Sequence, residues 1–207
     1  PNLMIKVPAT LEGLPAITAL IAAGISVNVT LIFSLERYSE VIDAFFAGMA
    51  QAKSAGLELA SIHSVASFFI SRIDSAVDKE LKAIGNTDLL GKVAVANAHR
   101  AYALFLEKFN QTAWKDLEVN GALVQRPLWA STGVKDLAYA DTLYVDTLVA
   151  PHTVNTMPQS TLDAFLDHGD VKSDAITAEM ESASKTLAAL STLGISLDAI
   201  TDALEAD

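Results

Sequence analysis

The sequence predicts an α/β protein built from parallel strands, and three observations support this. Five short runs, either apolar throughout or alternating in polarity, have the character of strands, and each precedes a stretch with helical periodicity. Proline and glycine mark helix ends where this arrangement needs them, with Pro15 in a first turn and Gly24 at a stop. The chain has 207 residues, of which 51% are hydrophobic, enough to bury a substantial core. Strands alternating with helices are typical of βαβ units in a parallel sheet.

The elements follow one another in a regular order. The stretch between Phe68 and Leu123 is too long for a loop and one helix, so shorter helical pieces are expected on either side of a long helix there. Hydroxyl and carboxylate side chains can cap the helices of the tail, namely Ser160 or Thr161, Ser173-Asp174, and Ser196. The predicted strands are Leu3–Pro8, Ile25–Thr30, Ser61–Phe68, Leu123–Ala130 and Val154–Met157, and the main helices are Leu14–Ala23, Leu35–Ser54, Asn86–Lys108 and those beyond Ser160.

No repeat, low-complexity tract or linker interrupts the chain, so residues 1–207 are predicted to form a single domain. Five βα units do not close an eight-stranded barrel, which typically needs about 250 residues. Either three units are missing or the sheet is open, and periodicity leaves both alternatives standing. The chain starts at Pro1 and enters an apolar run almost at once. Because termini normally lie in poorly packed segments, we expect Pro1 to be an internal point of a longer protein.

Composition excludes several classes of function. The net charge of −11 opposes binding to nucleic acid and to anionic membranes, and no basic stripe counters it. No apolar stretch is long enough for a transmembrane helix, and no signal peptide is indicated. The absence of cysteine removes disulfides and thiolate metal sites. We therefore expect a soluble, cytoplasmic protein without nucleic-acid or membrane partners.

Lys6 is the first candidate for chemistry. Its neighbours are apolar, so its strand is predicted to be buried on both faces, with Lys6 near the C-terminal end. Barrel enzymes place their sites at that end of their strands. Burial disfavours the ammonium form of a lysine, and the neutral amine is the form that attacks a carbonyl. The alternative is a lysine whose stem packs against the strand while its charge reaches water.

The second strand alternates strictly between apolar and polar residues. Ile25, Val27 and Val29 share one face, and Ser26, Asn28 and Thr30 share the other. In a barrel covered by helices the polar face points inward, which places Asn28 and Thr30 at the same end as Lys6, one strand away. The alternative is an edge strand with a solvated face. An amine beside a hydroxyl and an amide suits carbinolamine formation and dehydration, which need proton transfers.

Two later segments could bind an anion. Arg72 follows the third strand among apolar residues, and its planar guanidinium suits phosphate. A salt bridge with Asp74 is the structural alternative. The fourth strand runs into Ser131-Thr132-Gly133-Val134-Lys135, which offers hydroxyl and backbone donors and a lysine. Many loops have this composition.

Other residues look structural. Trp114 and Trp129 are expected in the core. The four histidines lack metal-ligand spacing, so no metal site is expected; they are His63, His99, His152 and His168.

Several of these motifs together resemble the transaldolase family. The run Met4-Ile5-Lys6-Val7-Pro8-Ala9-Thr10 with Glu12-Gly13 is similar to the signature around its Schiff-base lysine. Four further segments fall in the family's order and cover nearly the whole chain; they are Asn28–Ser34, Ser67–Arg72, Arg126–Gly133 and Val154–Pro158.

The resemblance assigns roles to the strand residues. Lys6 corresponds to the nucleophile that forms the imine, and Thr30 to the hydroxyl that holds the catalytic water. Asn28 corresponds to a contact with the dihydroxyacetone carbons, and Ser67 to a site hydroxyl. No cofactor is implied, because the imine itself is the electron sink.

The resemblance also assigns phosphate contacts to Arg72 and Ser131. Relatives often carry an arginine two residues after that serine, where this chain has Gly133. Lys135 is the expected source of the positive charge instead.

The family fold is a (β/α)8 TIM barrel with the nucleophile on its fourth strand. The resemblance therefore implies that this chain holds strands 4–8 and the C-terminal helices. The family's acid–base aspartate and glutamate lie on strands one and three, so a missing N-terminal barrel segment is the expected partner.

The implied function is a transaldolase of the pentose phosphate pathway, with sugar phosphates as substrates. It moves a dihydroxyacetone unit from sedoheptulose 7-phosphate or fructose 6-phosphate to an aldose phosphate through the lysine Schiff base. Two alternatives are another class I aldolase, which releases free dihydroxyacetone, and a non-catalytic fragment.

Overall fold

The computed structural model describes residues 2–206, so Pro1 lies outside the described residues. The chain divides into two compact units. The first holds Pro1–Phe68 and Leu104–Pro127, and the second holds Phe69–Ala103 and Leu128–Asp207. That residues 1–207 form a single domain stays a prediction.

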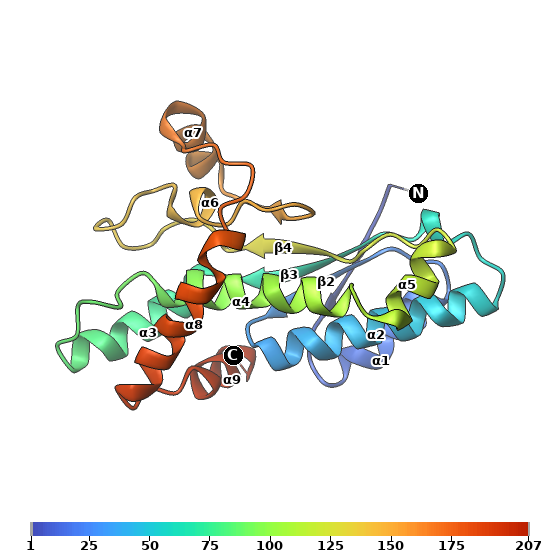
Figure 1. Ribbon diagram of the computed structural model, residues 1–207, viewed down its shortest axis with the longest axis horizontal. Helices are drawn as coiled ribbons and strands as arrows, with labels where there is room; N and C mark the ends of the chain where they lie inside the picture. The colour runs from blue at the N-terminus through green and yellow to red at the C-terminus, as the bar shows by residue number, and fades with distance from the viewer. Residues whose placement is uncertain (1, 207) are drawn as a thin grey trace. The chain divides into compact units, whose positions relative to one another are not determined.

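The predicted alternation of strands and helices is confirmed (Figure 1). The long helix after the second strand has the predicted bounds, and the strand ends differ from prediction by up to three residues. The strands are β1 Ile5–Pro8, β2 Val27–Ile32, β3 Ser64–Phe69, β4 Arg126–Ala130 and β5 Val154–Asn155. The helices are α1 Gly13–Ala22, α2 Leu35–Ser54, α3 Ser71–Ala83, α4 Val93–Lys108, α5 Thr112–Val119, α6 Leu143–Asp146, α7 Gln159–His168, α8 Met180–Thr192 and α9 Leu197–Ala206, with short 3-10 turns η1 Leu59–Ser61 and η2 Thr177–Glu179.

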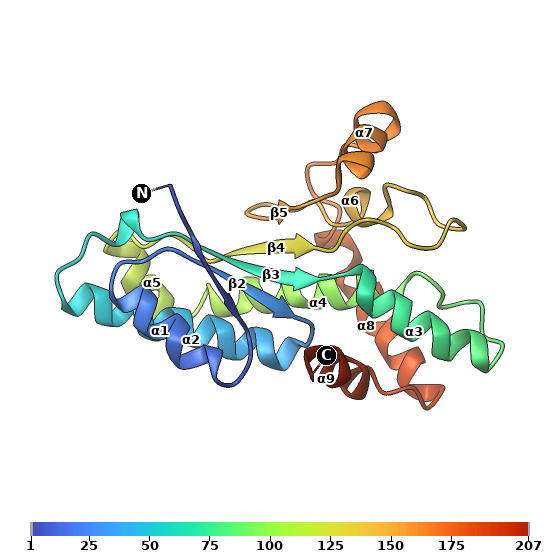
Figure 2. The ribbon, with the colours of Figure 1, turned by 180° about the vertical axis from the view of Figure 1, so that it is seen from behind.

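In the first unit, β2 lies between β1 and β3, and both pairs are parallel. Helices α1 and α2 lie on the same side of these strands (Figures 1 and 2). The strand residues facing the helices, such as Val27 and Val29, are fully buried, as is Ile21 of α1. Gly48 lets α2 approach α1, because a Cβ there would stand 2.7 Å from the Cβ of Ile21. One face of the strands is therefore the core of this unit.

An aromatic cluster joins α2 to α5 in the same unit. Trp114 is fully buried, and its ring centroid lies 6.0 Å from that of Phe45 and 5.3 Å from that of Phe46. Phe109 meets Trp114 edge to face at 4.7 Å. The predicted core role of Trp114 is confirmed.

The prediction that the first strand is buried on both faces is wrong. In β1 only Val7 is buried, whereas Ile5, Lys6 and Pro8 are exposed. Leu3 before it is 71% exposed. The physical reason is that β1 is the edge strand among the described strands of this unit, paired with β2 on one side. An apolar sequence shows that a strand can be buried, but whether it is buried depends on the elements that pack against it.

In the second unit, β4 pairs in parallel with β5. Trp129 of β4 is fully buried, as predicted, and its indole N–H donates to the carbonyl of Leu148 at 2.8 Å. The end of β3 runs beside β4, since the N–H of Ile70 donates to the carbonyl of Ala130 at 3.0 Å. The chain then turns into α3, whose first residue donates its N–H to the carbonyl of Ser131.

The predicted caps of the tail are partly confirmed. Ser196 accepts from the N–H of Ala199 at the start of α9. Asp174 accepts from two N–H groups at the turn that leads into α8. The capping role of Ser160 and Thr161 is wrong, because both lie inside α7, which begins one residue earlier.

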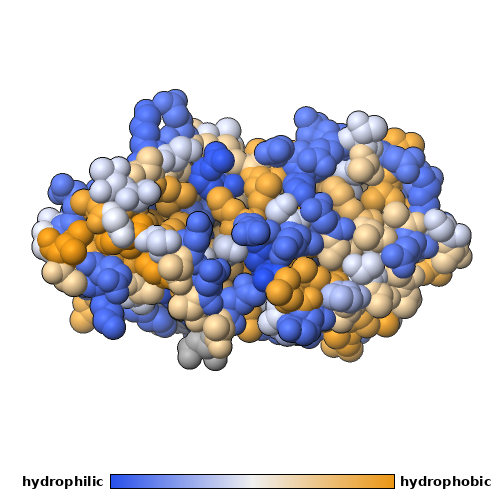
Figure 3. All heavy atoms as spheres, turned by 90° about the horizontal axis from the view of Figure 1, so that it is seen from below, coloured by the Kyte–Doolittle hydropathy of each residue, from blue (hydrophilic) through white to orange (hydrophobic). Residues whose placement is uncertain are grey.

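The described residues include no single helix long and apolar enough to cross a membrane, although the bent pair Thr177–Thr192 and Leu197–Ala206 meets that test jointly. Figure 3 shows polar residues interspersed among apolar ones on the face turned to the viewer.

Candidate functional site

The first unit brings together four of the predicted site residues. In the parallel register Lys6 is the partner of Asn28, and Pro8 is the partner of Thr30. Side chains of directly paired residues share a face, so Lys6, Asn28 and Thr30 lie on the face away from the apolar core. Ser67 joins them from β3, where its hydroxyl donates to Oδ1 of Asn28 at 2.7 Å. The predicted polar face is present across three adjacent strands.

Lys6 itself is exposed, which corrects the expectation of a buried amine. Among residues 2–206 it forms no ion pair, so no carboxylate holds its ammonium group in place. An accessible, unpaired amine beside an amide and a hydroxyl can reach a carbonyl carbon, which is the geometry that imine formation requires.

Thr30 has an unusual environment at the end of β2. The residue is 6% exposed, yet its Oγ1 has no hydrogen-bond partner among residues 2–206. The next residue, Leu31, has a φ of +63°, and the β2–β3 register shifts between Val29 and Ile32. A bulky side chain in the left-handed region is strained, and such strain concentrates at functional sites. The bulge therefore sets an unbonded, buried hydroxyl beside the strand that carries Lys6.

The second unit holds the predicted anion-binding residues. Arg72 is the second residue of α3; it is exposed, and its guanidinium carbon lies 5.2 Å from the ring centroid of Phe69. Ser131 has a φ of +56°, and its hydroxyl lies 2.9 Å from that of Ser71. The start of α3 and the end of β4 are thus bonded side by side. Two bonded hydroxyls thus lie at a helix N-terminus, a setting that favours anions, and Arg72 is the next residue of that helix.

The alternative of an Arg72–Asp74 salt bridge is wrong. Asp74 is buried, with one carboxylate oxygen accepting from the N–H of Ala94 at 2.8 Å and the other from the hydroxyl of Tyr144 at 2.8 Å. Among the described residues the guanidinium of Arg72 has no carboxylate partner, which leaves its charge for a ligand.

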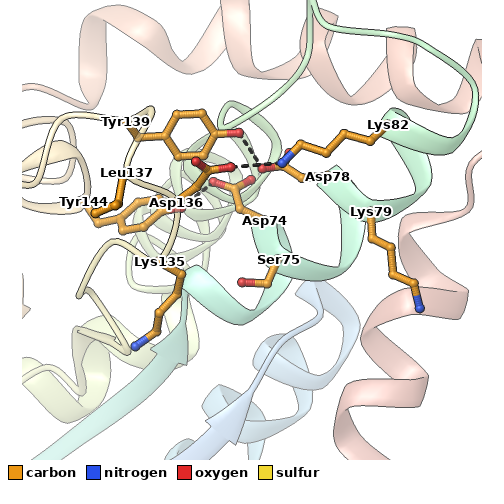
Figure 4. Close-up of a pocket in the computed structure, with 10 residues that line it drawn as sticks. All are labelled: Asp74, Ser75, Asp78, Lys79, Lys82, Lys135, Asp136, Leu137, Tyr139 and Tyr144. Carbon is orange, nitrogen blue, oxygen red and sulfur yellow. Dashed lines mark hydrogen bonds and ion pairs between the residues drawn. The ribbon is translucent and has the colours of Figure 1, made fainter.

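Lys135 lines a cavity of about 600 Å³ in the second unit (Figure 4). In that view its ammonium group points away from the acidic residues of the cavity. Gly133, two residues earlier, is packed against Pro158, and a Cβ there would stand 3.0 Å from the Cγ of that ring. A large side chain at Gly133 would displace this ring, so the nearest cation that the loop can offer is Lys135.

The residues behind this cavity were missed from the sequence. Asp74 and Asp78 of α3 are both buried, and Asp78 accepts from Tyr139 and from the N–H of Gly91. Burial raises the pKa of Asp74 to about 6, and the charge of Asp78 adds to the effect. A signal was available: the two aspartates continue the helical stripe of Ile70, Ile73, Val77 and Leu81 at its regular spacing.

The described part of the chain holds no group of three or more histidine, aspartate or glutamate side chains arranged to hold a metal ion.

Comparisons with known proteins converge on one family. A family model described as transaldolase/fructose-6-phosphate aldolase matches residues 1–207. Transaldolase 1 of Streptomyces avermitilis is 59% identical over 99% of this chain, which covers 55% of that protein. The transaldolase of Thermobifida fusca is 57% identical over 99% of this chain and 56% of its own length. The chain thus spans little more than half the length of these relatives.

Proposed function

The chain belongs to the transaldolase/fructose-6-phosphate aldolase family, and from that premise we propose that it carries the Schiff-base half of a transaldolase. The observation that carries the proposal is the shared face of β1 and β2, where Lys6 is in register with Asn28 next to the unbonded hydroxyl of Thr30. The substrates are a ketose phosphate donor, sedoheptulose 7-phosphate or fructose 6-phosphate, and an aldose phosphate acceptor, and the reaction belongs to the pentose phosphate pathway.

The proposed chemistry begins at the amine of Lys6. It adds to the ketose carbonyl and loses water to give an iminium ion. A base takes the proton of the hydroxyl on the fourth sugar carbon, the bond between the third and fourth carbons breaks with its electron pair moving to the iminium, and an aldose phosphate leaves. The remaining enamine attacks the acceptor aldehyde, whose oxygen takes up a proton, and water releases the new ketose. The family resemblance assigns these proton transfers to carboxylates of the N-terminal segment. Thr30 holds the water, while Asn28 and Ser67 orient the dihydroxyacetone hydroxyls. The imine supplies the electron sink, so no cofactor enters.

Arg72, Ser131 and Lys135 are proposed to bind the phosphate of the substrate. The support is chemical: an exposed guanidinium without a carboxylate partner, a bonded pair of serine hydroxyls and a lysine on the following loop. Ser131 bonds to Ser71 at the start of α3, Arg72 is the next residue of that helix, and backbone N–H groups there also favour an anion.

The direct test is borohydride trapping. The protein expressed from its complete gene is incubated with fructose 6-phosphate, reduced, digested and mapped by mass spectrometry. A dihydroxyacetone adduct of the Lys6 peptide is expected. A Lys115→Arg variant, which changes an exposed lysine paired with Glu118, should label as the wild type does. An adduct on another lysine, or none, contradicts the assignment.

A second candidate is fructose 6-phosphate aldolase activity, favoured by the description of the family that matches the chain. The two activities share the imine and differ in whether water or an aldose takes the enamine. Product analysis with and without erythrose 4-phosphate separates them: a transaldolase gives little free dihydroxyacetone, and an aldolase accumulates it in both cases.

We propose further that the strands belong to a (β/α)8 barrel whose other strands lie in an N-terminal segment, and that the protein is cytoplasmic. The support for the barrel is that the chain spans 55% and 56% of two relatives. The remaining alternative is a non-catalytic fragment. Comparing borohydride trapping by residues 1–207 with trapping by the complete gene product distinguishes them, since a fragment traps no substrate.

A further inference from the structure

The loop between β4 and α6 is tied to α3 at both ends within the second unit. At its start, Ser131 bonds to Ser71 through both main chain and side chain. Toward its far end, the hydroxyl of Tyr139 donates to Oδ2 of Asp78 at 2.6 Å; just beyond the loop, the hydroxyl of Tyr144 in α6 donates to Asp74 at 2.8 Å. Lys135 lies between the two attachments.

The aspartates are built as anchors rather than as reactive groups. Asp78 is 5% exposed, and its second oxygen accepts from the N–H of Gly91 at 3.1 Å. The ring of Tyr139 packs against Gly91, where a Cβ would stand 2.9 Å from the ring and where φ is +69°. One carboxylate therefore fixes a phenol and a backbone turn together. Both phenol contacts are drawn in Figure 4.

Burying two carboxylates one helical turn apart has a desolvation cost. If packing were their only role, two apolar side chains would fill the same space without that cost. The attached loop, however, holds Ser131 and Lys135, two of the groups assigned to phosphate. The salt bridge of Lys82 with Asp136 joins the same loop to α3, but it is solvent-exposed and contributes little. A fixed loop presents its donors to an anion without an ordering cost at binding.

We propose that Tyr139 and Asp78 are positioning residues, which set phosphate affinity by holding the loop that carries Ser131 and Lys135. This role rests on the proposed function of the phosphate-binding residues. It makes Tyr139 a determinant of the preference for phosphorylated sugars, acting through the loop and without contact with substrate.

The test is Tyr139→Phe in the protein expressed from its complete gene. This change keeps the ring over Gly91 and removes the hydroxyl from Asp78. The dissociation constant for inorganic phosphate and the KM for fructose 6-phosphate should each rise about tenfold, as loss of one charge-assisted hydrogen bond predicts. The kcat and the kcat/KM for unphosphorylated fructose should stay within about twofold, because the imine site is unchanged.

Tyr102→Phe is the matched control, since it removes a buried phenol hydrogen bond to the carbonyl of Pro151 away from this loop. It should leave phosphate affinity unchanged. If Tyr139→Phe folds poorly, Asp78→Asn provides the second variant, because it keeps an acceptor for Gly91 and weakens the phenol contact. The proposal is overturned if phosphate binds as in the wild type while only thermal stability falls, or if both sugars are affected equally.

Failure of the proposed function gives a different result. If the wild type traps no sugar at Lys6 yet Tyr139→Phe weakens phosphate binding, the imine assignment is wrong and the positioning role stands. If the wild type traps sugar at Lys6 and Tyr139→Phe binds phosphate as the wild type does, the imine assignment stands and the positioning role is wrong. A wild type that binds no phosphate overturns the positioning role.

Discussion

The hydrogen bonding of buried polar groups differs between the end of β2 in the first unit and the first turns of α3 in the second. In the described part of the first unit, Thr30 buries a hydroxyl that has no hydrogen-bond partner, and Lys6 on the adjacent strand forms no ion pair with a carboxylate. In the second, Asp74 and Asp78 are equally buried, and each accepts two hydrogen bonds. Thr132 also has two acceptors for its hydroxyl.

We interpret the difference between Thr30 and the two aspartates as one between a group that can bind a ligand and groups that hold the chain in place. An unbonded buried hydroxyl costs about 1–3 kcal/mol and needs an explanation, which a bound water or substrate would supply. A fully bonded carboxylate needs none beyond the segments that it connects.

Lys6→Arg should separate activity from stability. Arginine keeps the positive charge but cannot form the imine, so transaldolase activity should fall by more than about a thousandfold. Because Lys6 is exposed and unpaired, the free energy of unfolding should change by less than about 0.5 kcal/mol. Activity assays and urea denaturation of the two proteins check both parts. Loss of stability together with activity would show that Lys6 supports the fold.

The sequence was informative where the relevant contacts are local. Strict alternation in β2 correctly predicted which side chains share a face, and periodicity gave the bounds of α2, where the structure shows Ser34 as the cap that accepts from the N–H of Arg37. The bulge at Leu31 was missed, because a leucine in the left-handed region contradicts its own propensity. The prediction that Lys6 is buried was wrong, because the burial of a strand depends on packing by elements that are distant in sequence.

The candidate site shows the same division. The strand partners Lys6, Asn28 and Thr30 could be predicted from period and order. The contact of Ser71 with Ser131 could not, because the two residues are 60 positions apart. The buried aspartates of α3 lay on a visible apolar stripe, yet nothing in the sequence identified Tyr139 and Tyr144 as their partners. These partners are set by tertiary contacts, which local sequence patterns do not encode.

Asp74 should make stability depend on pH in an unusual direction. Its pKa is about 6 in the folded protein and near 3.8 when exposed, so the folded state binds the proton more tightly. Its stabilising contribution is complete below pH 4 and is lost as pH rises through about 6, by roughly 3 kcal/mol at about 1.4 per pKa unit. Asp74→Asn keeps an acceptor for Ala94 and carries no charge. Between pH 4 and pH 7 the variant should gain that amount relative to wild type.

Tyr144→Phe is the matched change for this measurement. The phenol hydrogen bond lowers the pKa of Asp74, so its loss should raise that pKa and move the wild-type transition to higher pH. Denaturant midpoints measured across the pH series distinguish the variants. A difference between Asp74→Asn and wild type that does not change with pH would mean that the carboxyl titrates as if exposed.

Replacing either of two buried threonines, Thr30 or Thr132, with valine should change stability in opposite directions by small amounts. Thr30→Val removes a hydroxyl without a partner among the described residues and should stabilise the protein by up to about 1 kcal/mol. If Thr30 holds the water as proposed, activity should fall about ten- to a hundredfold. Thr132→Val removes the single hydroxyl proton for which Asn155 Oδ1 and the carbonyl of Thr156, 2.9 and 2.8 Å away, are the two acceptors, and should destabilise by about 1–2 kcal/mol. Thermal unfolding and steady-state assays measure both. Equal destabilisation by the two changes would show that Thr30 is bonded in solution to a structural partner, and the contrast between the units would then disappear.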